Sequence, residues 1–151
     1  MSRLPPERER CFPLLLSRGY EVSTPADWDY NCIAFAADVQ NSWWWPDPHC
    51  DAFWPNGVER ELKLEAFVRA YATVGYEVCQ DGSFEPGYEK IAIYEKDGVP
   101  THAAKQTAEG RWMSKLGPWE DIRHNAADGV ETWAGIGIYG KVRQYMRRKR
   151  I

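Results

Sequence analysis

The chain has 151 residues, which is enough for one hydrophobic core of ordinary size, and we expect a single domain over residues 1–151. Hydrophobic residues make up 44% of the chain and charged residues 27%, a composition typical of globular proteins. Because the net charge is -3 and no stretch of about 18 consecutive apolar residues occurs, the composition predicts neither nucleic-acid binding nor insertion into a membrane.

Four cysteines are present, Cys11, Cys32, Cys50 and Cys79, and no secretory signal is visible before them. The default compartment of such a chain is reducing, so we expect a cytoplasmic protein with free thiols. A free thiol can serve as a nucleophile, which makes the surroundings of each cysteine informative.

Motifs for cofactors and metals are absent from the sequence. There is neither a glycine-rich phosphate loop nor a Walker-type lysine, and no CxxC or HExxH spacing occurs. His49, Cys50 and Asp51 are adjacent, and adjacent side chains rarely reach one metal ion together. We therefore expect no cofactor and no metal.

Helices are predicted in the first half of the chain. Residues 5–16 can form a short helix that is interrupted by proline, and residues 58–74 space their apolar side chains as the best amphipathic helix of the chain. Between them, residues 30–40 suit a largely buried helix with Asp27 or Asp29 as its N-cap. Residues 42–55 contain three prolines and cannot continue that helix.

The second half of the chain has the period-two pattern of strands. Glycine-containing turns at residues 96–98 and 109–110 predict hairpins between some of them. The predicted strands are residues 76–79, 89–94, 101–106, 111–116 and 136–146. Helices followed by antiparallel strands predict an α+β domain, with N-terminal helices packed on an antiparallel sheet.

Cys32 lies in the first turn of the predicted helix over residues 30–40. The unpaired N–H groups and the dipole of a helix start favour a thiolate, so the position predicts a lowered pKa for Cys32. The backbone N–H of Cys32 is the simplest donor for an oxyanion, and Tyr30 or Asn31 could add a side-chain donor to a bound substrate.

His102 is the best candidate for the base that would activate Cys32. It begins a predicted strand, and the small Ala103 and Ala104 after it would let a helix approach the sheet closely. A third polar group usually orients such a base. Ser114 can do so in one hairpin register, and Asp121 carries the better chemistry for accepting a proton from the imidazole. His124 is either a second candidate base or a surface residue after a turn, and we favour the surface residue.

The tryptophans after the Cys32 helix have two interpretations. Trp43, Trp44 and Trp45, with Trp54, could line an aromatic groove for a substrate, because tryptophan offers a large stacking surface. Alternatively, the loop uses these aromatic side chains to anchor itself to the core. The sequence does not distinguish between these two roles.

A cysteine that opens a buried helix, followed by antiparallel strands with a histidine at the start of one, resembles the papain-like cysteine hydrolases, particularly cell-wall peptidases of the NlpC type. The resemblance spans residues 30–116 and implies a papain-like core in which Cys32, His102 and a later polar residue act in that order. Those enzymes typically have Asp where this chain has Asn31. The segments YNCIAFAADVQNSWWWPDP, PTHAAKQ and GRWMSKLG also resemble a family of uncharacterised bacterial proteins.

Two functions follow from these patterns. The first is a cysteine hydrolase or acyltransferase that acts on an amide or thioester bond in a peptide-like or acyl substrate. The second is a non-catalytic protein that binds a protein partner through the surface formed by residues 43–45. The sequence carries no signal for an oligomeric state.

Overall fold

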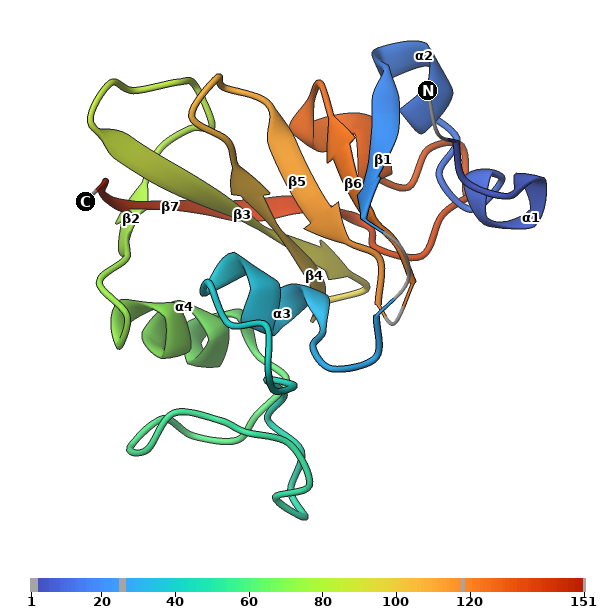
Figure 1. Ribbon diagram of the computed structural model, residues 1–151. Helices are drawn as coiled ribbons and strands as arrows, with labels where there is room; N and C mark the ends of the chain where they lie inside the picture. The colour runs from blue at the N-terminus through green and yellow to red at the C-terminus, as the bar shows by residue number, and fades with distance from the viewer. Residues whose placement is uncertain (1–2, 25–26, 118, 151) are drawn as a thin grey trace.

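The computed structural model describes residues 3–24, 27–117 and 119–150, and its centre is a seven-stranded antiparallel sheet (Figure 1). The order of the strands across the sheet is β1-β6-β5-β4-β3-β7-β2. The strands are β1 (Tyr20–Thr24), β2 (Glu77–Cys79), β3 (Tyr88–Lys96), β4 (Val99–Gln106), β5 (Trp112–Lys115), β6 (Asp121–His124) and β7 (Lys141–Lys149). The mixture of a few helices with an antiparallel sheet agrees with the expected α+β class.

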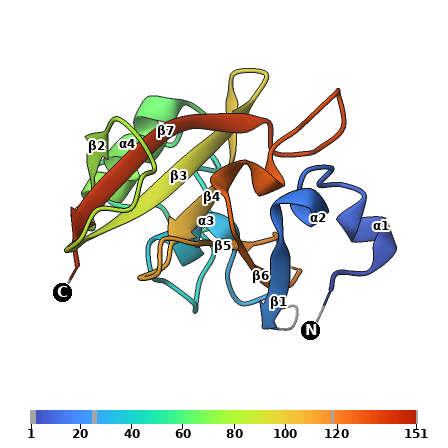
Figure 2. The ribbon, with the colours of Figure 1, turned by 90° about the horizontal axis from the view of Figure 1, so that it is seen from above.

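Short helices cover both faces of the sheet. Helices α3 (Cys32–Ala36) and α4 (Leu64–Ala72) lie on one face, which we call the α3 face (Figure 1). Helices α1 (Pro6–Glu9) and α2 (Leu15–Arg18), with the 3-10 helix η1 (Ala127–Val130), lie beside β1 and β6 on the opposite face (Figure 2). None of the helices in the described ranges has the length and apolar character needed to cross a membrane.

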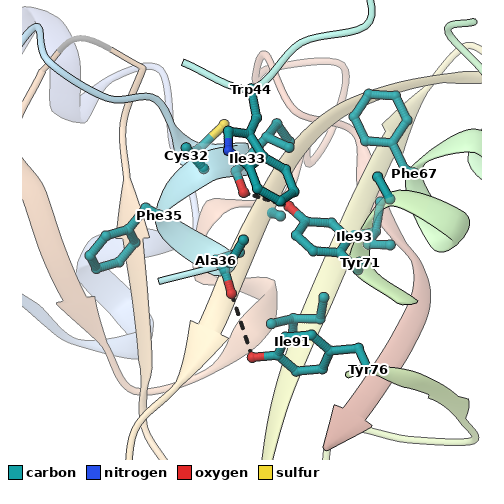
Figure 3. Packing of buried hydrophobic residues seen from close by; sticks show 14 of the residues in the cluster. Cys32, Ile33, Phe35, Ala36, Trp44, Phe67, Tyr71, Tyr76, Ile91 and Ile93 are labelled. Carbon is teal, nitrogen blue, oxygen red and sulfur yellow. Dashed lines mark hydrogen bonds between the residues drawn. The ribbon is translucent and has the colours of Figure 1, made fainter. Parts of the chain in front are cut away.

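The core on the α3 face joins both helices to the middle strands. Ile91, Ile93 and Ala103 point from the sheet toward α3, whose five residues are all buried. The small Ala103 lets the helix come close to the sheet, as its sequence predicts. The hydroxyl of Tyr71 in α4 donates to the carbonyl of Ile33 at 2.9 Å and ties the two helices together (Figure 3).

The opposite face has its own core because neighbouring residues of a strand point to opposite sides. Ala92, Tyr94 and Ala104 alternate with the residues that face α3. They pack with side chains from the N-terminal segment and β6, among them Phe12 and Ile122. His102 pairs with Tyr94 across the β3–β4 hairpin and shares this face.

Strand β4 pairs with β5 only at its C-terminal end, and the two strands diverge toward the N-terminal end of β4. Their only backbone pairs among the described residues are Lys105 with Met113 and Gln106 with Trp112, whereas β5 pairs with β6 over its whole length. The segment 99–104 therefore has no paired strand on its β5 side. His102 and Ala103 lie in this segment, directly beside the start of α3.

Several predicted elements differ from the observed ones. Strands β1 and β6 were not predicted, and α3 and α4 are shorter than the helices expected over residues 30–40 and 58–74. The last strand begins at Lys141 instead of residue 136 because Gly135, Gly137 and Gly140 all have positive φ and form a loop. A side chain at position 140 would collide with the carbonyl of Glu95, so this close approach requires glycine.

Candidate active site

Asn31 organises the start of α3. Its side-chain oxygen accepts hydrogen bonds at 3.1 Å from the backbone N–H of Ala34 and from that of Trp44, and its amide nitrogen donates to the Trp44 carbonyl at 2.8 Å. Asn31 is thus the N-cap that sequence analysis had assigned to Asp27 or Asp29. Through these contacts with Trp44, Asn31 positions the loop of residues 42–55, which we call the tryptophan loop.

Cys32 is the first residue of α3 and is buried, with 6% of its surface exposed. Burial raises the pKa of its thiol to about 11, although hydrogen bonding from the backbone N–H of Ala103 and the charge of Lys115 act in the other direction. The predicted lowering of this pKa is therefore wrong for this structure. Helix α3 has only five residues, and the stabilisation that its N-terminus gives a thiolate is smaller than the cost of placing that charge among apolar neighbours such as Trp44 (Figure 3).

His102 is completely buried and is held by a chain of hydrogen bonds. Its Nε2 lies 3.0 Å from Oγ of Ser114, and that Oγ lies 2.8 Å from Nε2 of His124. Nδ1 of His124 lies 2.8 Å from the carbonyl oxygen of Ala126. We call these three side chains and the Ala126 carbonyl the His–Ser–His relay. Ser114 is therefore in the hairpin register that faces His102.

The ring of His102 lies against two tyrosines. It stacks on Tyr139 with ring centres 3.9 Å apart and an interplanar angle of 7°, and it is tilted against Tyr94 at 5.1 Å. Its second nitrogen, Nδ1, is buried without a hydrogen-bond partner in the described part of the chain. Burial holds the pKa of His102 well below its usual value, so the imidazole is neutral at pH 7.

Cys32 and His102 are neighbours without being paired. No hydrogen bond joins the thiol to the imidazole within the described ranges, and the two side chains belong to different core layers. Two features nevertheless connect them. The backbone N–H of Ala103, which belongs to the peptide bond after His102, faces the Cys32 sulfur as a hydrogen-bond donor and lowers the pKa of the thiol. Tyr139, whose ring stacks on His102, lines a cavity together with Cys32.

Asp121 does not contact His102. It pairs with Lys115 across β5 and β6, and directly opposite residues share a face, so Asp121 points to the α3 face while Ser114 and Ile122 point to the other. There its carboxylate accepts a hydrogen bond from the buried hydroxyl of Tyr30 at 2.7 Å. Of the two residues expected to orient His102, Asp121 and Ser114, the geometry favours Ser114. The hydroxyl of Tyr30 is likewise committed to Asp121.

A cavity of about 530 Å³ opens beside Cys32. Its wall contains residues from the tryptophan loop, from the start of β4 and from the segment before β7. The lining residues are Asn31, Cys32, Trp43, Trp45, Asp47, His49, Asp51, Ala52, Thr101, Gly117 and Tyr139. Small-molecule sites in proteins are commonly concave and partly aromatic like this cavity, which lies next to the Cys32 thiol.

The tryptophans divide between the two roles considered from the sequence. Trp43 is 37% exposed and lines the cavity with the half-buried Trp45. Trp44 and Trp54 are buried, at 4% and 3% exposure, and pack against aromatic side chains of α4. Trp44 therefore serves the core and is not available as a substrate-binding surface.

Two site residues were missed or misjudged in the sequence. His124 was interpreted as a surface residue, yet it is completely buried. The alternation of Ile122 and His124 in one short strand could have indicated that both share the buried face. Tyr139 follows a glycine-rich loop, and no local pattern marks it. Among the residues that the structure describes, no three His, Cys, Asp or Glu side chains come together as a metal site.

Comparison with known proteins assigns the chain to a family. The profile of DUF7689, a domain of unknown function, matches residues 21–147, and the chain therefore belongs to this family. This agrees with the resemblance to uncharacterised proteins noted in the sequence. Searches among curated proteins and among solved structures give no match.

Proposed function

We propose that this member of the DUF7689 family is a cysteine hydrolase or acyltransferase that acts on an amide or thioester bond of a peptide-like or acyl substrate. The observation that carries the proposal is the buried, unpartnered Nδ1 of His102, because its ring stacks on the same tyrosine that lines the Cys32 cavity. A buried nitrogen without a partner costs about 1–3 kcal/mol. A role as a proton acceptor would account for this cost.

In the proposed reaction both groups start uncharged, since the pKa of Cys32 is raised and that of His102 is lowered. The Cys32 sulfur bonds to the substrate carbonyl carbon while Nδ1 of His102 takes the thiol proton. The tetrahedral intermediate then expels the leaving amine or thiol, which receives this proton from His102. Water, or an acceptor amine, finally attacks the thioester and releases Cys32. The thiol and Nδ1 of His102 must come within hydrogen-bond distance before the first step.

The surrounding residues have supporting roles in this proposal. The backbone N–H of Cys32 is the candidate oxyanion donor at the start of α3. Trp43 and Trp45 would form the binding surface for the acyl group, with Ser114 orienting His102. The proposal includes a papain-like core, with Ser114 as the third residue of its catalytic set. The four unpaired cysteines suit a reducing compartment, and we place the activity in the cytoplasm.

The test uses a peptide vinyl sulfone, an electrophile that reacts with cysteine, on a variant in which Cys11, Cys50 and Cys79 are serine. Removing the base by His102→Gln should slow labelling of Cys32 at least about 10-fold, since general-base catalysis contributes about 10²–10⁴-fold. The matched control is His49→Gln, which removes an exposed histidine of the same cavity. Equal labelling rates in the His102 and His49 variants would contradict the proposal.

A second candidate function is supported by exposed aromatic side chains on the tryptophan loop and on the segment before α3. Trp28 is 70% exposed and Phe53 is 50% exposed, and Trp43 donates from its indole nitrogen to the Trp28 carbonyl at 2.7 Å. These residues could bind a protein partner without any chemistry at Cys32. In that case Trp43→Ala would weaken capture of the partner and Cys32→Ala would not. The opposite pattern would favour the catalytic function.

A further inference from the structure

His124 lies at the far end of the hydrogen-bond chain that holds His102, and its own two ring nitrogens are both engaged. Nδ1 faces the carbonyl oxygen of Ala126 at 2.8 Å, and Nε2 faces the hydroxyl of Ser114, also at 2.8 Å. A carbonyl oxygen can only accept a hydrogen bond. This one contact fixes the direction of every other hydrogen bond in the His–Ser–His relay.

We propose that His124, acting through Ser114, holds His102 in the tautomer that carries its proton on Nε2 and leaves a lone pair on Nδ1. His124 must carry its proton on Nδ1 to donate to Ala126. Its Nε2 is then an acceptor and takes the single proton of the Ser114 hydroxyl. Ser114 has no second proton to give, so its oxygen accepts the third bond, which Nε2–H of His102 donates.

The reverse direction is disfavoured by the same geometry. If Ser114 donated to His102, Nε2 of His124 would have to donate to Ser114, and its unprotonated Nδ1 would face the Ala126 carbonyl. Two acceptors would then lie 2.8 Å apart in a buried site. A doubly protonated His124 would avoid this, but burial lowers its pKa to about 4, so the ring is neutral at pH 7.

The consequence for chemistry rests on the proposed function. A neutral histidine can accept a proton only on the nitrogen that lacks one, and for His102 this is the buried Nδ1. His124 would thus be a positioning residue that never touches substrate. In the other tautomer the lone pair of His102 would face Ser114, and Nδ1 could not accept the thiol proton.

Nitrogen-15 NMR of the histidine rings tests the proposal without a substrate, because protonated and unprotonated ring nitrogens have distinct shifts. The chain has three histidines, and His49→Gln leaves only the two of interest. In this background we expect His102 to be protonated on Nε2 and His124 on Nδ1. A folded protein with His102 protonated on Nδ1 would overturn the proposal.

Variants then test the role of His124. His124→Phe leaves the Ser114 proton with no acceptor except His102, so His102 should switch to the Nδ1–H tautomer. In His124→Gln the side-chain oxygen can replace Nε2 as the acceptor and should preserve the wild-type tautomer. A folded His124→Phe protein with an unchanged His102 would also overturn the proposal. If His124→Phe does not fold, Ser114→Ala should give a mixture of both tautomers, and a single unchanged tautomer would count against the relay.

The outcome is separable from that of the proposed function. An Nε2–H tautomer of His102 that depends on His124, in a protein whose Cys32 labels at the same rate with and without His102, would keep the relay and reject the catalytic role. If both proposals hold, His124→Phe should slow Cys32 labelling by at least about 10-fold, as expected for His102→Gln, because both variants remove the general base. His124→Gln should restore most of that rate.

Discussion

The two faces of the sheet bury their polar groups in different ways. On the face of α1 and α2, the His–Ser–His relay is uncharged at pH 7, and its members hydrogen bond to one another. On the α3 face, Lys115 and Asp121 bring charged groups into the interior beside Tyr30, and burial lowers the pKa of Lys115. We therefore expect the relay to be destabilised when a histidine is protonated, and the buried charged groups to be destabilised when a partner is removed.

The α3 face also carries the larger aromatic core, and the largest effect is expected there. Phe67 is fully buried and packs edge-on against Trp45 and Trp54. Phe67→Ala should destabilise the protein by about 3–5 kcal/mol, because a large cavity replaces the ring. Urea unfolding measures the change, with Phe84→Ala as the control, since Phe84 is 50% exposed. Similar losses in both variants would contradict this description of the core.

On the opposite face, acid should weaken the fold through His124. Its pKa is about 4 in the folded protein and near 6.5 when unfolded, so the unfolded state binds the proton more readily between these values. The stabilisation is complete above pH 6.5 and decreases by about 3 kcal/mol as the pH falls to 4.

Unfolding free energies measured from pH 7 to pH 4 test this expectation. His124→Gln should have a shallower pH dependence than wild type, and His49→Gln should have the wild-type slope because His49 is exposed. A wild-type slope in the His124 variant would show that another group is responsible.

A smaller difference between the faces is expected when single hydroxyl groups are removed. Tyr30 donates to the Asp121 carboxylate at 2.7 Å, and Tyr94 donates to the uncharged Ala127 carbonyl at 2.6 Å. Tyr30→Phe should cost about 2 kcal/mol and Tyr94→Phe about 1 kcal/mol, since hydrogen bonds to charged groups contribute more. Thermal or urea unfolding gives both values, and the reverse order would argue against a charged Asp121.

The smallest effect on stability is expected at the cavity wall. Trp43 is partly exposed, so Trp43→Ala should change the free energy of unfolding by about 0.5 kcal/mol or less. Trp44→Ala, at the next position, should cost about 3–5 kcal/mol because Trp44 is buried against Tyr71. Equal losses of unfolding free energy in the two variants would contradict the assignment of Trp43 to the cavity and Trp44 to the core.

Local patterns predicted much of the fold. The hairpin of β3 and β4, its turn at residues 96–98, and the amphipathic stretch that contains α4 all follow from periods of a few residues. Strands β1 and β6 are different, because Tyr20 pairs with His124 from the other end of the chain. Short strands of this kind are stabilised by their distant partner, and their own sequences carry little signal.

For the candidate site, the sequence indicated which residues to consider, but it did not predict how their side chains are arranged. Cys32 at the first turn of a buried helix and His102 near the start of a strand could be read from the chain. Which side of the sheet each residue faces depends on register, and a shift of one residue exchanges Ser114 with Lys115 or Asp121 with Ile122. The pKa of Cys32 could not be predicted either, because it depends on how tightly Ala103 and Trp44 enclose the thiol.

The position of β7 has a consequence for how the chain folds. This strand, formed by residues 141–149, lies between β3 and β2, although both of those strands are synthesised long before it. Until β7 arrives, β3 has an open edge next to the apolar Ile91 and Ile93. Contacts between residues so far apart in sequence form slowly, and unpaired edges promote aggregation. We therefore expect this edge of β3 to stay unpaired in the nascent chain until residues 141–149 have been made and have docked.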